Sequence, residues 1–152
     1  MHLEELSELF KKRGLTLGSV ESFTGGKFAS EITSIPGASK FFKGAVVTYW
    51  TEIKNEVVNV PKDITDKYGV VSKETAYYMA KNGKALLNVD YCVAFTGNAG
   101  PEAMENKPVG EIYIAIANID VEVYSYRLSG NRGKIQEEAI RLVSEKLKEK
   151  LK

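Results

Sequence analysis

The sequence predicts an α/β fold in which helices cover both faces of a mixed, mainly parallel β-sheet. Apolar, β-branched segments alternate along the chain with segments whose apolar residues recur at helical spacing, a pattern typical of parallel strands joined by helices. Two strand-like segments near the C-terminus, 110–117 and 121–127, are separated only by residues 118–120. So short a connection makes an antiparallel hairpin, and the sheet is therefore expected to be mixed.

The first half of the chain alternates between the two patterns. Leucines and Phe10 recur at helical spacing until Gly14 ends the pattern. The run 41–50 is aromatic and β-branched, and such a run suits a buried strand. In this half we expect helices over 3–13, 25–33, 52–58 and 61–69, and strands over 15–20 and 41–50.

The second half contains the strongest helical patterns. Ser72 can cap a long helix that starts at Lys73, because its hydroxyl can accept a hydrogen bond from the first turn. The apolar stretch that includes Cys92 is typical of a buried strand. In this half we expect helices over 73–87 and 134–151, and strands over 91–96, 110–117 and 121–127.

Length and composition exclude several classes of protein. A chain of 152 residues fits one domain, which we expect to span residues 1–152, and 43% hydrophobic residues with 27% charged residues suit a globular protein. No apolar run reaches the roughly 20 residues of a membrane span. A net charge of +1 argues against binding to nucleic acids. The single cysteine excludes an internal disulfide, so we expect a cytoplasmic protein. From the length of the apolar runs and from the net charge, we expect it to bind neither membranes nor nucleic acids.

The scarcity of histidine and cysteine limits the possible chemistry. The only histidine is His2, near the N-terminus, so a Ser-His-Asp triad, a Cys-His pair and an ordinary zinc site have no internal histidine available. Cys92 lies in an apolar stretch and is expected to be a buried core residue. A hydrolase built from this chain would therefore use a hydroxyl nucleophile with a lysine, tyrosine or carboxylate as the base.

Polar loops follow several of the predicted strands. In open α/β sheets, ligands bind beyond the carboxyl ends of the strands. Hydroxyl groups and glycines at the start of a helix also suit an anion such as phosphate. Any one of these loops could equally well be a structural turn. We expect all of them to lie at the same edge of the sheet, however, and this predicts a ligand site there. The loops are 21–26, 48–54, 96–101 and 129–132.

These loops and their neighbours closely resemble the C-terminal domain of the competence-damage-inducible CinA proteins. The resemblance runs in order from about Leu15 to the last helix, and the motifs are specific only when taken together. They are Glu21-Ser22-Phe23-Thr24-Gly25-Gly26, Gly44-Ala45-Val46-Val47-Thr48-Tyr49 with Glu52 and Lys54, Gly69-Val70-Val71-Ser72, Thr96-Gly97-Asn98-Ala99-Gly100-Pro101, Lys107-Pro108-Val109-Gly110 and Gly130-Asn131-Arg132.

The resemblance implies both a fold and an activity. The family fold is a three-layer α/β/α sandwich on a mixed sheet. Family members of this type are amidohydrolases of the pyridine nucleotide cycle that convert nicotinamide mononucleotide to nicotinate mononucleotide and ammonia. The resemblance further implies that no metal or cofactor is required and that the protein forms a homo-oligomer, a dimer or higher. Longer relatives carry an additional N-terminal domain, so we expect this chain to represent the standalone form.

The resemblance also assigns roles to individual residues. It implies that Ser22 is the nucleophile, that Lys54 is the general base after burial has lowered its pKa, and that Tyr49 relays or orients the proton. From the residues alone, Lys54 could instead be a solvated surface lysine and Tyr49 a strand-end aromatic. The implied substrate-binding residues are Glu21, Thr24, Gly25, Gly26, Thr96, Gly97, Ala99, Gly100 and Arg132.

Among these residues, one group is assigned to the phosphate of the substrate, whereas the role of Glu21 stays open. Thr24 and the glycine pair after it, together with Arg132 as their charge partner, would bind the phosphate of the substrate. Glu21 could hold the lysine or a ribose hydroxyl, or it could simply cap the following helix.

Three departures from the family pattern support a second interpretation. Phe23 stands where the family usually has cysteine, and Trp50 and Thr51 replace a small residue followed by asparagine or aspartate. A segment rich in glycine is replaced by residues 102–106, whose two carboxylates would repel a phosphorylated substrate. The alternative to a hydrolase is therefore a catalytically silent member of the family that binds a nucleotide or serves as an interaction module.

Overall fold

The computed structural model describes residues 2–152, except for the side chain of His2, so the expectation about this histidine lies outside the described residues. The helices are α1 (His2–Arg13), α2 (Lys27–Thr33), α3 (Thr51–Glu56), α4 (Lys62–Tyr68), α5 (Lys73–Leu87) and α6 (Arg132–Leu151), with a short 3-10 helix at Ala38–Lys40. The strands are β1 (Leu17–Glu21), β2 (Phe42–Val47), β3 (Tyr91–Gly97), β4 (Glu111–Ala117) and β5 (Val121–Arg127). These boundaries lie within a few residues of those expected from the sequence.

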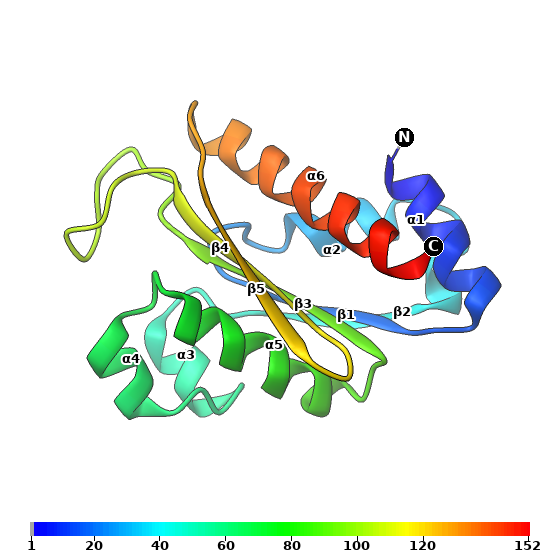
Figure 1. The fold of residues 1–152 in the computed structure, drawn as a ribbon, viewed down its shortest axis with the longest axis horizontal. Coiled ribbons are helices and arrows are strands. Elements are labelled where there is room, and N and C mark those ends of the chain that lie inside the picture. The colour runs from blue at the N-terminus through cyan, green and yellow to red at the C-terminus, as the bar shows by residue number, and fades with distance from the viewer. Residues whose placement is uncertain (1) are drawn as a thin grey trace.

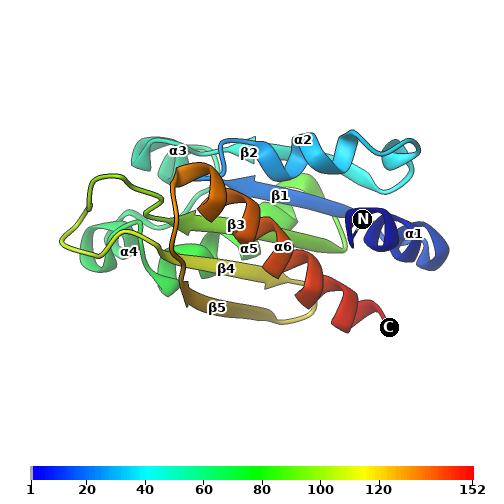
Figure 2. The ribbon, with the colours of Figure 1, turned by 90° about the horizontal axis from the view of Figure 1, so that it is seen from above.

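The strands form one mixed sheet in the order β2-β1-β3-β4-β5, seen from above in Figure 2. β1 pairs in parallel with both of its neighbours, so that Val20 lies between Val46 and Ala94. β3, β4 and β5 pair antiparallel, and the expected hairpin joins β4 to β5, where the amide of Asn118 donates to the carbonyl of Asp120 at 2.9 Å. The prediction of an α/β fold on a mixed sheet is confirmed.

Helices cover both faces of the sheet and give three layers. α1, α2 and α6 lie on one face, and α3, α4 and α5 lie on the other (Figure 1). The core beneath α1, α2 and α6 is rich in phenylalanine, whereas the core beneath α5 consists largely of alanine and valine. In α5, a Cβ atom added at Gly83 would lie only 2.4 Å from Val20 Cγ2, so this glycine lets the helix approach the sheet closely. The three-layer sandwich is therefore the observed architecture.

Two sequence predictions about single residues hold in this framework. The Ser72 hydroxyl caps α5 by accepting a hydrogen bond from the amide of Thr75 at 3.1 Å. Cys92 is fully buried, and burial raises the pKa of its thiol to about 12. Such a thiol stays protonated near neutral pH and is unreactive, which agrees with the core role expected for it.

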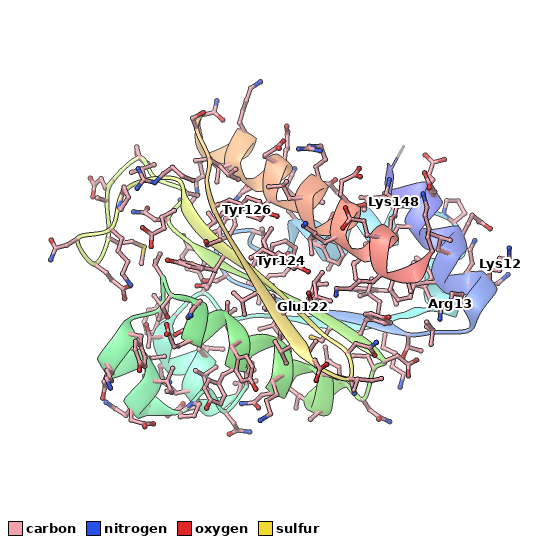
Figure 3. All side chains as sticks on the ribbon, viewed as in Figure 1. Lys12, Arg13, Glu122, Tyr124, Tyr126 and Lys148 are labelled. Carbon is pink, nitrogen blue, oxygen red and sulfur yellow. The ribbon has the colours of Figure 1, made fainter. Side chains whose placement is uncertain are left out.

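The first and the last helix, α1 and α6, lie next to each other on one side of the molecule (Figure 1). Figure 3 shows Arg13 on α1 and Lys148 on α6 where the two helices meet. Arg13 donates to the carbonyl of Leu151 at 3.1 Å, and the amine of Lys148 lies 3.8 Å from the carboxylate of Glu5. These contacts fix the last helix against the first. Within residues 2–152, no helix is both long enough and apolar enough to cross a membrane.

One expectation about the fold is wrong. The sequence predicts a buried strand over 41–50, but β2 stops at Val47 and forms an edge of the sheet, where its side chains are exposed or only partly buried. Tyr49 and Trp50 are 60% and 69% exposed. The physical reason is that an edge strand pairs on one side only, and the aromatic residues beyond β2 belong to the turn into α3.

Candidate active site

A cavity of about 450 Å³ lies beyond the carboxyl ends of β1 and β3. Three of the polar loops that the sequence singles out form its walls. Its lining comprises Ser22 and Phe23 after β1, Tyr49, Thr51 and Lys54 after β2, residues 96–102 and Met104 from the end of β3 and the loop after it, and the single residues Val70 and Arg132. Of the fourth loop, 129–132, only Arg132 lines the cavity. Asn131 caps α6 by accepting a 2.9 Å hydrogen bond from the amide of Lys134.

Ser22 and Lys54 meet at the base of this cavity. Ser22 follows β1 directly, and its amide donates to the carbonyl of Phe95 on β3 at 3.0 Å. The side chain of Lys54 on α3 is only 1% exposed. Its amine donates to Ser22 Oγ at 2.9 Å and to the carbonyl of Thr48 at 2.5 Å. The serine hydroxyl and the lysine amine, which the family resemblance pairs, are therefore in direct contact.

Burial changes the chemistry of the Lys54 amine. Removal from water disfavours the charged form and lowers the pKa of Lys54 to about 8, while the negative charge of Glu105 acts in the opposite direction. A lysine with this pKa is neutral in about one molecule in ten at pH 7. Only the neutral amine can accept a proton, so the lowered pKa makes Lys54 able to act as a base next to the hydroxyl of Ser22.

Tyr49 and Arg132 meet at the rim of the cavity. One terminal nitrogen of the Arg132 guanidinium donates to the Tyr49 hydroxyl at 2.9 Å, and the other donates to the carbonyl of Gly100 at 2.7 Å. Arg132 thus connects the loops that follow β2 and β3. Among the described residues, the Tyr49 hydroxyl has no hydrogen bond to Ser22 or Lys54. In this geometry Tyr49 is part of the rim, and its expected role in relaying or orienting the proton stays a prediction.

Glu21 is fully buried and does not line the cavity. Its carboxylate accepts hydrogen bonds from the hydroxyls of Ser19 and Thr24, at 2.9 and 2.8 Å, and from the amides of Phe28 and Ala29, both at 3.0 Å. The two amides belong to the first turn of α2, where a negative charge is favoured by the helix dipole. Of the roles considered for Glu21, the geometry supports the capping of the following helix.

The start of α2, near which the sequence predicts a phosphate site, is occupied by the carboxylate of Glu21. Thr24 uses its hydroxyl on Glu21, and Gly25 and Gly26 lie in the turn before α2, with positive φ angles of 60° and 95° and outside the cavity lining. Glu21 therefore uses donors at the start of α2, and the binding of a phosphate by Thr24, Gly25 and Gly26 stays a prediction. The implied substrate-binding residues that do line the cavity are Thr96, Gly97, Ala99, Gly100 and Arg132.

The residues that depart from the family pattern lie in different environments. Phe23 is 3% exposed, and its ring packs edge-on against Phe95 at 6.4 Å between centroids, so the core accommodates it. Glu102 lines the cavity as expected, but Glu105 does not. The carboxylate of Glu105 instead accepts hydrogen bonds from the backbone amides of Val70 and Val71.

Other residues of the site were not singled out from the sequence. The carbonyl of Thr48 orients Lys54, and the side chain of Gln136 on α6 donates to the carbonyl of Phe23 at 2.8 Å, beside Ser22. A backbone carbonyl gives no signal in a sequence, and Gln136 is recognisable only as the single glutamine of the chain. In residues 2–152, no group of three or more His, Cys, Asp and Glu side chains is placed to hold a metal ion.

Comparison with known proteins identifies the family of this chain. The sequence matches the family model of the CinA C-terminal domain over residues 2–151. Curated relatives described as putative competence-damage inducible proteins come from Bacillus cereus and from Bacillus thuringiensis (strain Al Hakam). Each is 44% identical over 132 residues, which cover 86% of this chain and 32% of the relative. The chain thus spans about a third of the length of these relatives.

Solved structures give the same result for the fold. The CinA superfamily protein from Klebsiella pneumoniae 700603 matches with a TM-score of 0.96 at 26% identity, over 99% of this chain and 95% of that chain. The competence/damage inducible protein CihA from Agrobacterium tumefaciens matches with a TM-score of 0.90 at 30% identity, over 97% and 94% of the two chains. The chain therefore belongs to the CinA C-terminal domain family.

Proposed function

We propose that this protein hydrolyses the carboxamide of nicotinamide mononucleotide to nicotinate mononucleotide and ammonia. The observation that carries the proposal is the 2.9 Å contact between the Lys54 amine and Ser22 Oγ inside the cavity. Amide hydrolysis requires a nucleophile and a base of suitable pKa in contact, and this pair meets both requirements. Membership of the CinA C-terminal domain family, which includes amidohydrolases, supports the choice of reaction.

The first half of the reaction forms an ester. Neutral Lys54 accepts the hydroxyl proton of Ser22 as Ser22 Oγ attacks the carboxamide carbon, which gives a tetrahedral intermediate. Lys54 then donates this proton to the amide nitrogen, the carbon–nitrogen bond breaks, and ammonia leaves. In the second half, water attacks the ester and gives its proton to Lys54. Lys54 returns this proton to Ser22 Oγ as the bond between the carbonyl carbon and Oγ breaks, and the product leaves as the acid, which gives its remaining proton to solvent.

The developing oxyanion requires hydrogen-bond donors near Ser22. The backbone amides of Phe23 and Ala99 are suited to this role, because both residues line the cavity and neither amide has a hydrogen-bond partner among the described residues. Arg132 is the group that would bind the phosphate, since its contacts with Tyr49 and Gly100 use only part of the donor capacity of a guanidinium. Glu102 lines the same cavity and would weaken this binding by repulsion.

A second candidate function is that of a nucleotide-binding module without catalysis. The observation that favours it is the replacement of glycines by residues 102–106, which puts the carboxylate of Glu102 into the cavity lining. Calorimetric titration with nicotinamide mononucleotide separates the two functions. Saturable binding without turnover would favour the module, and the absence of both binding and turnover would exclude both.

The direct test is ammonia release from nicotinamide mononucleotide by the wild type and the variants Ser22→Ala and Lys54→Ala. We expect the wild type to release ammonia and nicotinate mononucleotide in equal amounts, and loss of the base to lower kcat by about 10²- to 10⁴-fold. The matched controls are Ser30→Ala and Lys40→Ala, which change exposed residues of the same two types and should keep wild-type activity. Unchanged ammonia release by Ser22→Ala would refute the mechanism.

A further inference from the structure

The loop between β3 and β4 contains a tight turn at residues 104–107. The amide of Lys107 donates to the carbonyl of Met104 at 2.9 Å, and the two central residues, Glu105 and Asn106, have positive φ angles of 55° and 58°. This is the backbone of a two-residue hairpin turn, which normally contains glycine or asparagine. The left-handed conformation is unfavourable for glutamate, so other contacts must hold Glu105 in place.

The contacts that hold Glu105 come from a distant part of the chain. Its two carboxylate oxygens accept hydrogen bonds from consecutive backbone amides, Val70 at 2.9 Å and Val71 at 3.0 Å, and we call this pair of bonds the Glu105 clamp. Two residues further on, the amine of Lys107 donates to the carbonyl of Tyr68 at 2.9 Å and to the carbonyl of Val71. The turn is therefore attached to the segment 68–71 through hydrogen bonds to both amides and carbonyls.

The segment 68–71 depends on these side chains because it lies outside the sheet. The carbonyl of Val70 accepts a hydrogen bond from the Thr96 hydroxyl at 2.7 Å, so side chains satisfy both polar backbone groups of this residue. Val70 is 8% exposed and Val71 is fully buried. Loss of the Glu105 carboxylate would leave two buried amides without an acceptor, which is costly.

The Glu105 clamp joins two walls of the cavity. Val70 lines one wall, and the loop that carries Glu105 supplies Glu102 and Met104 to another. Gly69 makes room for the clamp, because a Cβ atom there would lie 2.5 Å from a Glu105 oxygen. We propose that Glu105 is a positioning residue, which holds the 101–107 loop against Val70 and Val71 and so fixes the shape of the cavity around Ser22 and Lys54. Its catalytic consequence rests on the proposed amide hydrolysis.

The charge of Glu105 also acts on the base. The charged side chains around Lys54 are Glu105, whose negative charge raises the pKa of Lys54, and Glu102 and Arg132, which line the same cavity. Lys107 is 3.6 Å from Glu105 and compensates its charge in part. Replacement of Glu105 by glutamine removes the negative charge, so the pKa of Lys54 should fall further. The rise of activity with pH should then occur at lower pH than in the wild type.

The test compares Glu105→Gln and Glu105→Asp with the control Glu56→Gln, which removes one negative charge from the exposed surface of α3. Hydrogen exchange is measured at the amides of Val70 and Val71, and ammonia release is measured as a function of pH. In Glu105→Gln the side chain keeps one acceptor oxygen and presents an NH₂ group to the other amide, so we expect exchange to accelerate about 10- to 100-fold at one of the two amides at least. We also expect kcat/KM to fall about tenfold, with its pH midpoint moved to lower pH. The control should match the wild type in all three measurements.

Glu105→Asp keeps the charge but shortens the side chain, so we expect faster exchange with a smaller shift of the pH midpoint. It also serves as the test variant if Glu105→Gln does not fold. Wild-type exchange rates at Val70 and Val71 in a folded variant would refute the Glu105 clamp, whatever the activity. Accelerated exchange with an unchanged pH profile and kcat/KM would refute the positioning role. If the wild type releases no ammonia, the proposed function fails, and exchange alone decides whether the clamp exists.

Discussion

The amine of Lys54 lies 2.9 Å from the hydroxyl oxygen of Ser22, on a lysine side chain that is only 1% exposed. Lysine is almost never buried to this degree unless a specific contact compensates it. Here the carbonyl of Thr48 and the hydroxyl of Ser22 provide that contact, yet burial still lowers the pKa of the amine to about 8. The fold thus tolerates an unfavourable buried ammonium at the position where the proposed mechanism requires a neutral amine.

The first prediction concerns the pH dependence of ammonia release. Because neutral Lys54 is the proposed base, log kcat/KM should rise with a slope of about 1 below pH 8 and level off above it, following the lowered pKa of about 8. Measurement of initial rates from about pH 6 to 10 tests this. Lys54→Arg keeps the positive charge but cannot lose its proton, so it should be inactive at every pH. A flat wild-type profile would contradict the assignment of Lys54 as the base.

The second prediction concerns the stability cost of Lys54. The pKa of Lys54 is about 8 in the folded protein, whereas an ordinary lysine, as in the unfolded chain, has a pKa of 10.5. Between pH 8 and pH 10.5, therefore, the unfolded chain keeps a proton on Lys54 that the folded protein has lost. The free energy of unfolding therefore rises with pH across this window. Below pH 8 the folded protein bears the full cost of burying the charged lysine. Relative to Lys54→Met, the wild type should gain up to about 3 kcal/mol between pH 7 and 10.5.

Chemical denaturation of both proteins at several pH values measures this difference. At neutral pH we expect Lys54→Met to be at least as stable as the wild type, although inactive. All other titrating groups are the same in both proteins, so the difference in unfolding free energy isolates the lysine. A difference that does not vary with pH would show that the pKa of Lys54 is that of an ordinary lysine.

The fold followed from the sequence because its signals are local. The alternation of strand and helix patterns, the cap at Ser72 and the short connection after Ala117 each depend on neighbouring residues, and each has its expected place in the structure. The burial of residues 41–50 did not follow. An apolar strand at the edge of a sheet has the same composition as one at its centre, and the order of strands depends on pairing between distant segments.

The site could be predicted only in part, for the same reason. Ser22 and Lys54 belong to motifs that follow strands, and the sheet brings them together. The direction of a carboxylate has no such local signal. The carboxylate of Glu21 points to the start of α2, and the carboxylate of Glu105 accepts from an amide 35 residues away, so neither residue lines the cavity. Contacts of this kind are determined by tertiary packing, which no pattern along the chain reports.

The third prediction concerns Glu21. Four donors surround its buried carboxylate, and an uncharged glutamine would present an NH₂ group to donors where an oxygen acceptor is required. Because hydrogen bonds to charged groups are worth about 1.5–3 kcal/mol each, we expect Glu21→Gln to lower the free energy of unfolding by about 2–4 kcal/mol. Urea denaturation measures this change.

The control for Glu21→Gln is Glu52→Gln, the same substitution at an exposed position in the first turn of α3. An exposed glutamate without such a network should change stability by no more than about 0.5 kcal/mol. Equal effects of the two substitutions would mean that the Glu21 network contributes nothing beyond a surface charge. It would also reopen the start of α2 as an anion site, since the carboxylate would not be needed there.

The last prediction concerns two hydroxyl groups in the helix layer formed by α1 and α6. Ser7 and Ser144 are both fully buried, and neither side-chain oxygen has a hydrogen-bond partner within residues 2–152. A buried hydroxyl without a partner costs about 1–3 kcal/mol, so Ser7→Ala and Ser144→Ala should each stabilise the protein by about 1 kcal/mol or more.

Thermal and chemical denaturation test this against Ser30→Ala, which makes the same substitution at an exposed position of α2. That control reports the better helix propensity of alanine alone, about 0.5 kcal/mol. The two buried substitutions should exceed it, because they also remove an unpaired polar group from the core. If Ser7→Ala or Ser144→Ala destabilises the protein, that hydroxyl has a partner in solution, such as a carbonyl of its own helix or a bound water molecule, and the α1–α6 layer is better satisfied than its contacts indicate.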